Sequence, residues 1–429
     1  MTKGRICVLA GASLGGTEKA ATIFAAQLAG RGYDVDYLAA PGPRSEFLKL
    51  NNVRVIDANK SVSDLYDYIA QRRPDVIHQH VPGYPVPNNL YPVLQRSHPR
   101  RPKIIETNIF GRFEDSLSEQ FVDFRMFISM ASAAQAFRRA RIKDIRTQLD
   151  RNTVVYYPVA EPSLIDLDVR EGFRRDLNIG ADEILAVRVG RAGHKWASWE
   201  CEAYAIARKR SPRLRLFLME PPGWLAREIA AGRFGTGIIV QKECSDFAWL
   251  ERLYASADLM IHASDWGESF GYTIAEGMAA GLPVITRSTP WCDNAQVELV
   301  KNRETGFVCW SVPELARRLV DFAENRGMRK NMGTAAKNRI LRLASPSDEL
   351  ELLEDVILYC TTGSTIGRIT SRNTALLRFI GSFARLERTT SDMWRDHPLD
   401  FSVATIYAYY RRLRATLGAF VRSWLQPAQ

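Results

Sequence analysis

Short apolar runs alternate with amphipathic segments along the first part of the chain. Each apolar run has the length of a buried strand, and each amphipathic segment has the length of a helix. We expect strands at 6–10, 33–39, 53–56, 75–78, 103–107 and 126–129, and helices at 17–31 and 62–73. Strands that alternate with helices form βαβ units on a parallel sheet, and right-handed crossovers then give a doubly wound domain.

The alternation pauses at 154–162 and then starts again. This segment is a strand that ends in two prolines, Pro158 and Pro162, which is typical of a hinge between domains. Beyond it we expect strands at 184–189, 214–219, 237–240, 259–262 and 283–286, and helices at 197–210 and 270–280. The second part therefore predicts another doubly wound parallel sheet. Two facing domains of this kind leave a cleft, and ligands bind there at the carboxyl ends of the strands.

Only helices are predicted after the second sheet. A capping box with an early proline at 311–314 starts a helix that runs toward 325, and another helix starts at Ser347 and runs to Tyr359. Beyond Gly363 the alternation is lost, and the chain is rich in arginine and aromatic residues. We expect this tail to be helical.

Composition narrows the class of protein. The chain has 429 residues, of which 46% are hydrophobic and 25% charged, as in a soluble globular protein of two or three domains. No stretch approaches the roughly 18 consecutive apolar residues of a spanning helix, and the first residues lack the pattern of a signal peptide. The six cysteines are scattered, without metal-ligand spacing. We therefore expect a cytoplasmic protein.

Positive charge is concentrated near the C-terminus. The formal net charge is +10, and the residues from 361 onward contain ten arginines and no lysine against four acids, a net charge of +6. Basic surface suits an anionic partner such as nucleotide phosphates, an anionic membrane or nucleic acid. In the tail, Arg411, Arg412 and Arg414 interleave with aromatic and apolar residues, and a second basic stretch spans 138–146. These stretches are either membrane-contact segments or solvated helix faces.

The strongest chemical signal is the segment 268–285, ESFGYTIAEGMAAGLPVI. Its carboxylates, Glu268 and Glu276, are separated by a stretch that begins as a glycine-containing loop and ends as a helix. The free N–H groups at a helix start suit a diphosphate. Glu268 can accept hydrogen bonds from sugar hydroxyls, and Glu276, two turns into the helix, can chelate a ribose diol. The alternative interpretation is an ordinary helix with two exposed acids.

This segment resembles the E-x7-E signature of retaining glycosyltransferases with the GT-B fold, in the large glycogen-synthase-like group. The resemblance covers residues 6 to 360. It implies sugar transfer from a UDP-, GDP- or ADP-sugar with retention at the anomeric carbon, without a metal, and with the nucleotide sugar as substrate rather than cofactor. It also implies that the helix ending at Tyr359 crosses back to the first domain.

Two further segments resemble elements of the same family. Arg191 and Lys195 follow the first strand of the second domain, where the family's cations hold the diphosphate of the sugar donor. Fixed cations of this kind neutralise the charge that develops on the leaving group. Gly15 and Gly16, followed by Glu18, resemble the family's Gly-Gly-x-Glu loop, which meets the phosphates and the acceptor from the opposite wall. The alternatives are a solvated basic loop and a tight turn.

Three other residues occupy places that the family uses. His80 ends a strand that resembles the family's Asp-Val-x-His-x-His element and could contact sugar or acceptor. Asn108 stands where many relatives carry a histidine near the anomeric centre, and this change removes a titratable group. Glu298 matches a family glutamate only loosely, and a packing element is the alternative.

The sequence thus predicts an α/β protein with the GT-B fold, two facing Rossmann-like domains and a helical tail. The predicted limits are 1–160 for the acceptor-side domain, 161–344 for the nucleotide-sugar domain, 345–363 for the cross-over helix and 364–429 for the tail. The predicted catalytic residues are Arg191, Lys195 and Glu268. The predicted contacts to the sugar donor are Gly15, Gly16, Ser269, Phe270, Gly271, Tyr272 and Glu276. Glu18, His80 and Asn108 are candidates for the acceptor or the sugar, and no metal site is predicted.

Other functions fit parts of this pattern. A nucleotide-sugar epimerase or hydrolase would use the same fold, and a non-catalytic protein could bind a sugar nucleotide. Nucleic-acid binding has no groove-reading motif to support it. We expect a UDP- or GDP-sugar as donor, a sugar, lipid or glycan as acceptor, and peripheral contact with the cytoplasmic face of an anionic membrane. The expected role is in glycan, glycolipid or polysaccharide biosynthesis.

Overall fold

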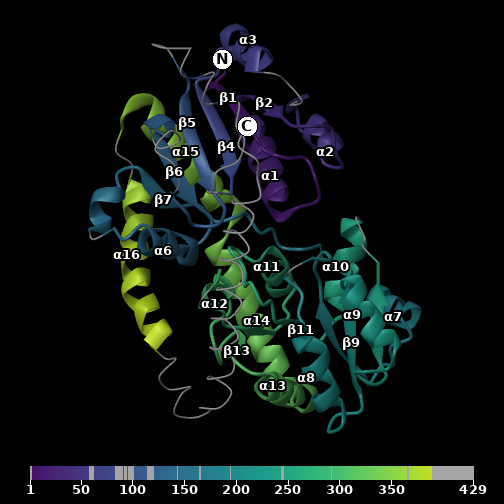
Figure 1. Cartoon of the computed structure of the whole chain (residues 1–429). Helices are drawn as coiled ribbons and strands as arrows, with labels where there is room; N and C mark the ends of the chain where they lie inside the picture. Colours follow the sequence, from purple (N-terminus) through teal and green to yellow (C-terminus); the bar gives the residue numbers. More distant parts are fainter. Residues whose placement is uncertain are drawn as a thin grey trace, which may run out of the picture.

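Two parallel sheets, each covered by helices on both faces, make up the described part of the chain (Figure 1). The structure is a computed structural model that describes residues 2–57, 62–82, 90, 94, 101–113, 120–142, 144–163, 166–193, 195–242, 246–290, 292–364 and 367–388. This α/β architecture is the GT-B fold predicted from the sequence. The domain limits given above stay predictions.

The N-terminal sheet has seven parallel strands in the order β3-β2-β1-β4-β5-β6-β7. Its strands are β1 (Arg5–Leu9), β2 (Asp34–Leu38), β3 (Arg54–Ile56), β4 (Val76–Val81), β5 (Lys103–Asn108), β6 (Phe124–Phe127) and β7 (Asn152–Val154). The described helices between them are α1 (Gly16–Gly30), α2 (Ser45–Leu50), α3 (Val62–Arg72), α6 (Met130–Arg139) and a 3-10 turn, η1 (Ile145–Gln148). Alternate residues of β1 point to opposite faces of the sheet. Ile6 and Val8 pack with α1 and α2, and Cys7 packs with α3.

The C-terminal sheet has six parallel strands in the order β10-β9-β8-β11-β12-β13. Its strands are β8 (Ile184–Arg188), β9 (Leu214–Met219), β10 (Ile238–Gln241), β11 (Leu259–His262), β12 (Val284–Arg287) and β13 (Gly306–Cys309). The helices are α7 (Leu167–Asp176), α8 (Trp199–Arg208), α9 (Gly223–Ala230), α10 (Phe247–Ser256), α11 (Tyr272–Ala279), α12 (Gln296–Leu299), α13 (Val312–Glu324) and α14 (Arg326–Leu343).

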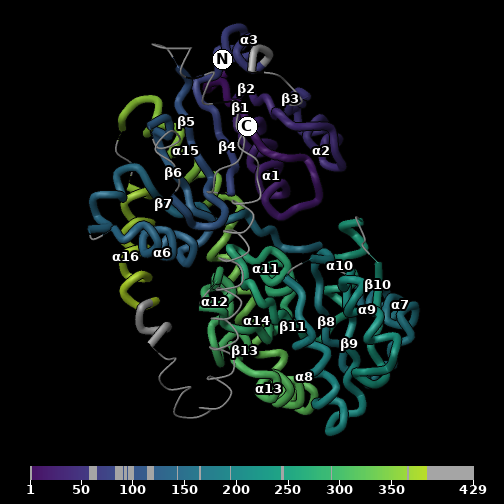
Figure 2. Tube along the Cα trace, viewed as in Figure 1, coloured from purple at the N-terminus to yellow at the C-terminus, as the bar shows by residue number. Residues whose placement is uncertain are grey.

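Two helices near the C-terminus bring the chain back to the N-terminal sheet (Figure 2). Helix α15 (Pro346–Thr362) packs on the face of that sheet beside α1, and α16 (Gly367–Arg388) lies along α6 and the edge strand β7. The first part of the tail is therefore helical, as predicted. The arginine-rich stretch around Arg411, Arg412 and Arg414 lies outside the described residues.

Side chains of α16 form hydrogen bonds with backbone carbonyl groups of β7, the edge strand of the N-terminal sheet. Arg372 donates to the carbonyl oxygen of Val154 (3.2 Å), and the Asn373 amide donates to the carbonyl oxygen of Asn152 (3.0 Å). An uncovered edge strand would offer its backbone groups to other chains. The tail helix thus closes this edge.

Six elements of the C-terminal domain were absent from the sequence prediction, namely helices α7, α9, α10, α12 and α14 and strand β13. Helix α14 is rich in charged residues and buries only three positions, Gly333, Ala336 and Ile340, so its apolar stripe is too narrow to stand out. Strand β13 has four residues and follows a charged loop. It is recognisable only by its parallel pairing with β12.

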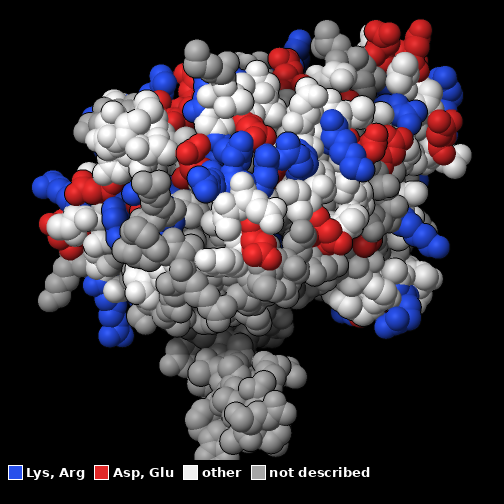
Figure 3. Space-filling model, turned by 90° about the horizontal axis from the view of Figure 1, so that it is seen from above, with Lys and Arg blue, Asp and Glu red and all other residues white. Residues whose placement is uncertain are grey.

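Basic and acidic side chains are interspersed on the face of the N-terminal domain shown in Figure 3. Asp34 and Asp36 on β2 bind the guanidinium groups of Arg5, Arg54 and Arg72, at distances of 2.8 to 3.0 Å. These ion pairs neutralise part of the positive charge that the composition records. In the basic stretch 138–146, Arg139 is exposed and donates to the carbonyl oxygens of Phe110 and Gly111.

Replacing Gly333 by alanine should destabilise the protein, although alanine is normally the better helix former by about 1 kcal/mol. A Cβ atom at Gly333 would lie 2.0 Å from the carbonyl oxygen of Gly281, so α14 would have to move away from the end of α11. We expect Gly333→Ala to lower the free energy of unfolding in urea by about 1–3 kcal/mol. Gly327→Ala in the same helix meets only ordinary contacts, and equal effects of the two changes would contradict this account.

The carboxyl group of Glu349 on α15 should make stability depend on pH. Burial raises its pKa to about 7, although the Arg372 guanidinium, 2.6 Å away, opposes the shift. Because the folded pKa is above the unfolded value of about 4.3, the stabilising contribution is complete below that pH and is lost as the pH rises to about 7. Glu349→Gln should therefore gain stability relative to the wild type, on the order of 2–3 kcal/mol, between pH 4.5 and 7.5. Urea unfolding at each pH measures this, and Glu351→Gln on the exposed side of α15 should show no such trend.

Candidate active site

The predicted site residues lie at the carboxyl ends of the strands where each sheet reverses its order. Strand β1 is followed by Gly15 and Gly16, β8 by Arg191 and Lys195, and β11 by Glu268. In each sheet the strand order changes direction beside these loops, between β1 and β4 and between β8 and β11. Such switch points leave a crevice in which open α/β sheets bind ligands. Here the two crevices face each other across the domain interface.

Glu268 is held by three groups of the C-terminal domain. The Lys195 ammonium lies 2.6 Å from one carboxylate oxygen, and the Nε2 atom of His262 lies 3.1 Å from the other. The backbone N–H of Glu268 donates to the side-chain oxygen of Gln296 (2.9 Å). The carboxylate is thus fixed in one orientation beside the loop that leads to α11.

The charges of this cluster follow from its surroundings. Burial alone would raise the pKa of Glu268, but the Lys195 ammonium and the hydrogen bond from His262 hold it well below the usual value. Burial and the nearby Arg188 lower the pKa of His262 to about 4. Near neutral pH, Glu268 is therefore ionised, and His262 is a neutral imidazole whose Nε2–H donates to Glu268. Sequence reasoning placed His262 in a strand but missed this contact.

The residues that follow Glu268 form the loop that leads into α11. Gly271 adopts a left-handed conformation (φ 97°, ψ 59°) directly before the helix. Phe270 is buried against Tyr157 of the interdomain segment, with ring centroids 5.5 Å apart. The Ser269 carbonyl oxygen accepts a hydrogen bond from the Ser129 hydroxyl of the N-terminal domain (2.7 Å). Ser269 and Phe270 therefore fix the start of α11 against the other domain.

Tyr272 is packed against the interdomain segment from the first turn of α11. Its ring stacks on that of Tyr157 with centroids 5.6 Å apart, and its hydroxyl donates to the Pro158 carbonyl oxygen (2.8 Å). The predicted hinge thus contacts the helix start that forms one wall of the cleft.

The glycine loop of the N-terminal domain approaches α11 and the β8 loop closely. A Cβ atom at Gly16 would lie 3.1 Å from the Tyr272 ring, and one at Gly15 would lie 2.0 Å from the Glu18 carboxylate and 3.3 Å from Arg191. Side chains at these positions would block the narrow space between the two domains. Gly16, Arg191, Tyr272 and Glu276 line one cavity there, with a volume of about 170 Å³.

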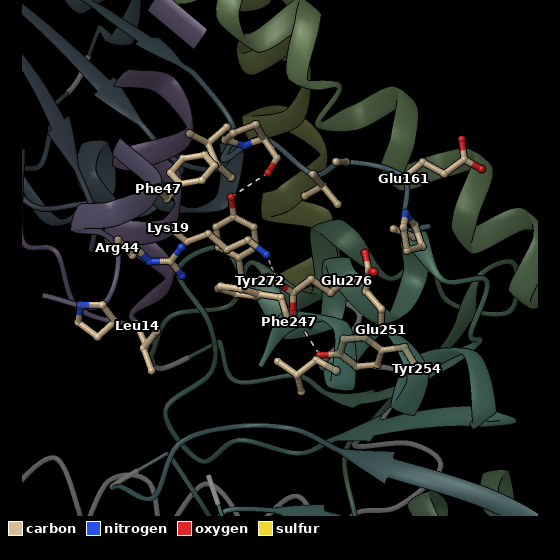
Figure 4. Close-up of a pocket in the computed structure, with 18 residues that line it drawn as sticks. Leu14, Lys19, Arg44, Phe47, Glu161, Phe247, Glu251, Tyr254, Tyr272 and Glu276 are labelled. Atoms are coloured by element: carbon tan, nitrogen blue, oxygen red, sulfur yellow. Dashed lines mark hydrogen bonds and ion pairs between the residues drawn. The ribbon is translucent and has the colours of Figure 1, made fainter. Parts of the chain in front are cut away.

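Glu276 makes a contact across the cleft that the sequence did not predict. The Lys19 ammonium, from the first turn of α1, lies 2.5 Å from Oε1 of Glu276. The hydroxyl of Tyr254 on α10 donates to the other carboxylate oxygen (3.1 Å). Figure 4 shows Lys19 and Tyr254 reaching the carboxylate from opposite sides. Lys19 follows the two glycines by three residues, so one helical turn brings it to the same cleft.

A larger cavity of about 560 Å³ extends from this ion pair between α1, α2, α10 and the interdomain segment (Figure 4). Its walls are largely apolar and aromatic. Arg44 is 7% exposed, donates from Nε to the Ser13 carbonyl oxygen (2.9 Å) and lies over the ring of Phe247. Arg44 and Phe247 are further residues of the cleft that sequence reasoning missed.

The three candidates for acceptor contacts have different surroundings. Glu18 lies beside the glycine loop, next to Gly15. Both ring nitrogens of His80 are buried and have no hydrogen-bond partner within the described residues. Burial and the adjacent His78 hold the pKa of His80 well below its usual value, so this imidazole is neutral.

Asn108 has a structural environment. Its amide donates to the Arg112 carbonyl oxygen (2.6 Å) and to Glu106 (3.1 Å), and its oxygen accepts from the Arg112 N–H (3.1 Å). The side chain is 1% exposed and fixes the loop after β5. These contacts favour a positioning role, and a contact with substrate stays a prediction.

Glu298 is buried at the domain interface rather than exposed in the cleft. Its carboxylate accepts from the N–H groups of Met130 (3.2 Å) and Ala131 (2.9 Å), at the start of α6, and from the hydroxyl of Tyr156 (2.6 Å). Burial raises the pKa of Glu298, and these hydrogen bonds oppose the shift. Of the two interpretations that the sequence left open, the geometry favours a packing element.

Two searches of the described residues complete the description of the site. They contain no group of three or more His, Cys, Asp or Glu side chains placed to hold a metal ion. None of their helices has the length and apolar character that a bilayer crossing requires.

Comparison with known proteins agrees with this geometry. Residues 170–339 match the family described as glycosyl transferases group 1. A glycosyltransferase from Rickettsia africae superposes with a TM-score of 0.70 at 16% identity, covering 85% of this chain and 100% of that one. Anabaena HepE in complex with UDP-glucose has a TM-score of 0.66 at 17% identity, covering 82% and 99%.

WaaG, a glycosyltransferase involved in lipopolysaccharide biosynthesis, has a TM-score of 0.60 at 16% identity and covers 84% of this chain and 100% of that one. No curated protein sequence matches the chain. At these identities the solved structures establish the fold. The match to the group 1 family over residues 170–339 agrees with this fold, which is GT-B.

Proposed function

We propose that this protein is a group 1 glycosyltransferase that uses a UDP- or GDP-sugar and transfers the sugar to an acceptor held by the N-terminal domain, with retention of configuration. One observation carries the proposal. The start of α1, the start of α11 and Arg191 meet at one interdomain cavity, which Glu276 also lines. Two helix starts and a guanidinium form an anion site, and a carboxylate beside it suits the ribose of a nucleotide.

In this proposal, different charged groups of the cleft bind different parts of the sugar donor. Arg191, Lys195 and the start of α11 at Gly271 and Tyr272 bind the diphosphate and stabilise its charge as it leaves. Glu276 binds the ribose hydroxyls. Glu268, held by Lys195 and His262, accepts hydrogen bonds from the transferred sugar.

The other predicted residues shape the site around these groups. Gly15 and Gly16 close over the phosphates, and Ser269 and Phe270 hold the loop before α11. Glu18, His80 and Asn108 belong to the acceptor side. The transfer needs no metal in this scheme, because cationic side chains and helix starts neutralise the leaving group.

We propose that retention arises from attack and departure on the same face of the sugar. Both oxygens of Glu268 have partners, an ion pair with Lys195 and a hydrogen bond from His262, so this carboxylate is a poor nucleophile. The leaving phosphate can instead take the proton of the attacking hydroxyl on the same face of the sugar. We further propose that the enzyme acts in glycan, glycolipid or polysaccharide synthesis in the cytoplasm, with peripheral membrane contact through the basic tail.

A screen of UDP-, GDP- and ADP-sugars for thermal stabilisation identifies the sugar donor. Incubation with that donor alone then separates transfer from the alternative activities. An epimerase would change the sugar, and a hydrolase would release it, without any acceptor.

Glu276→Ala should abolish the contribution of the ribose hydroxyls to binding. The wild type should bind the selected nucleoside diphosphate about tenfold more tightly than its 2′-deoxy form, as expected for a hydrogen bond to a charged group. In Glu276→Ala the two ligands should bind equally. Calorimetric titration of both ligands with both proteins forms a double-mutant cycle. Additive effects would show that Glu276 does not contact the ribose, and Glu251→Ala at the rim of the larger cavity controls for the lost charge.

The product should keep the anomeric configuration of the sugar donor. An α-linked nucleotide sugar should give an α-linked product, because attack and departure take place on one face. NMR coupling constants of the anomeric proton in the freshly formed product measure this. A β-linked product would contradict the retaining mechanism and leave the assignment of the diphosphate site unaffected.

A further inference from the structure

The ion pair between Lys19 and Glu276 occupies the place where the proposed function puts the ribose. The two charged atoms are 2.5 Å apart, and the side chains are 24% and 23% exposed. Tyr254 takes the other oxygen of Glu276, so both oxygens already have partners. A ribose diol that chelates this carboxylate therefore competes with the Lys19 ammonium.

The Lys19 side chain also borders a second part of the same cleft. It lines the cavity of about 170 Å³ together with Gly16, Arg191 and Thr273, at the starts of α1 and α11. In its present position the ammonium lies over the rings of Tyr272 (5.0 Å) and Phe247 (5.6 Å). Because the lysine side chain is long and flexible, we expect the ammonium to turn from the carboxylate toward the phosphate side.

The charge around Lys19 decides which ligand can displace it. Arg44 also lies over Phe247, and Arg191 lines the same cavity, so a Lys19 released from Glu276 joins two other cations. A neutral nucleoside would break the ion pair and leave these positive charges together. A nucleoside diphosphate would break the same ion pair and supply the negative charge that they need.

We propose that Lys19 determines specificity for nucleoside diphosphates, because it blocks the ribose subsite until a diphosphate attracts it away. The inference rests on the proposed function, since it requires Glu276 to bind ribose. It adds that a charged side chain of the N-terminal domain takes part in recognition of the sugar donor. The exchange also releases a contact between the domains at the moment when the sugar donor binds.

Substitution of Lys19 by methionine tests the proposal because it should change two affinities in opposite directions. Calorimetry would compare UDP with uridine and GDP with guanosine for the wild type and Lys19→Met. For the base that the enzyme accepts, the nucleoside should bind the variant about fivefold more tightly, the scale of one partly exposed ion pair. The diphosphate should bind about fivefold more weakly. The preference for diphosphate over nucleoside should therefore fall about 25-fold.

Lys49→Met on the exposed surface of α2 removes the same charge near the cleft without touching the site. It should leave the ratio of the two affinities unchanged, and thermal melting would establish that both variants are folded.

The outcomes separate this inference from the function on which it rests. If Lys19→Met weakens nucleoside and diphosphate alike, Lys19 is a simple ligand or a structural residue, and the inference is wrong. An unchanged nucleoside affinity overturns it as well. An unchanged diphosphate affinity overturns the step in which the released ammonium meets the phosphates. If the wild type binds neither UDP nor GDP, the proposed function fails and the inference fails with it.

Discussion

The buried carboxylate of Glu298 is the constraint on which the interdomain cleft depends. It belongs to the C-terminal domain, yet it accepts hydrogen bonds from the start of α6 in the N-terminal domain and from Tyr156 between them. An anion at a helix start is stabilised by the free N–H groups and the helix dipole. Around it, Phe270 and Tyr157 continue one apolar core across both domains. The facing walls of the cleft are therefore set by contacts outside the cleft itself.

Opposite charges are matched across the open part of the interface. Glu268 is paired within its own domain with Lys195, whereas Glu276 is paired with Lys19 of the other domain. The first pair can hold a carboxylate in place during binding and transfer. The second pair must reorganise if the carboxylate is to bind ribose. The same residue type thus has a fixed role at one position and an exchangeable role eight residues later.

The C-terminal helices connect this interface to the edge of the N-terminal sheet. Arg372 of α16 binds Glu349 of α15, and Glu349 in turn accepts from the backbone N–H of Tyr156 (2.8 Å). Tyr156 reaches Glu298 with its hydroxyl. The start of the tail is therefore part of the same hydrogen-bonded network as the domain interface. Arg372 of the tail connects α16 to this network through Glu349.

The sequence by itself determined the two parallel sheets, because alternating strands and helices leave few other topologies. It also determined the loop residues at the strand ends, where short motifs such as Gly15-Gly16 and Glu268 to Glu276 carry local chemistry. It could not determine which residues meet across the cleft. No local sequence pattern marks Lys19, Arg44 or His262 as residues of the cleft. Glu298 differs from the other acidic residues only through its contact with the start of α6. Only tertiary packing decides these contacts, because burial and the approach of distant groups fix the charge and the partner of each side chain.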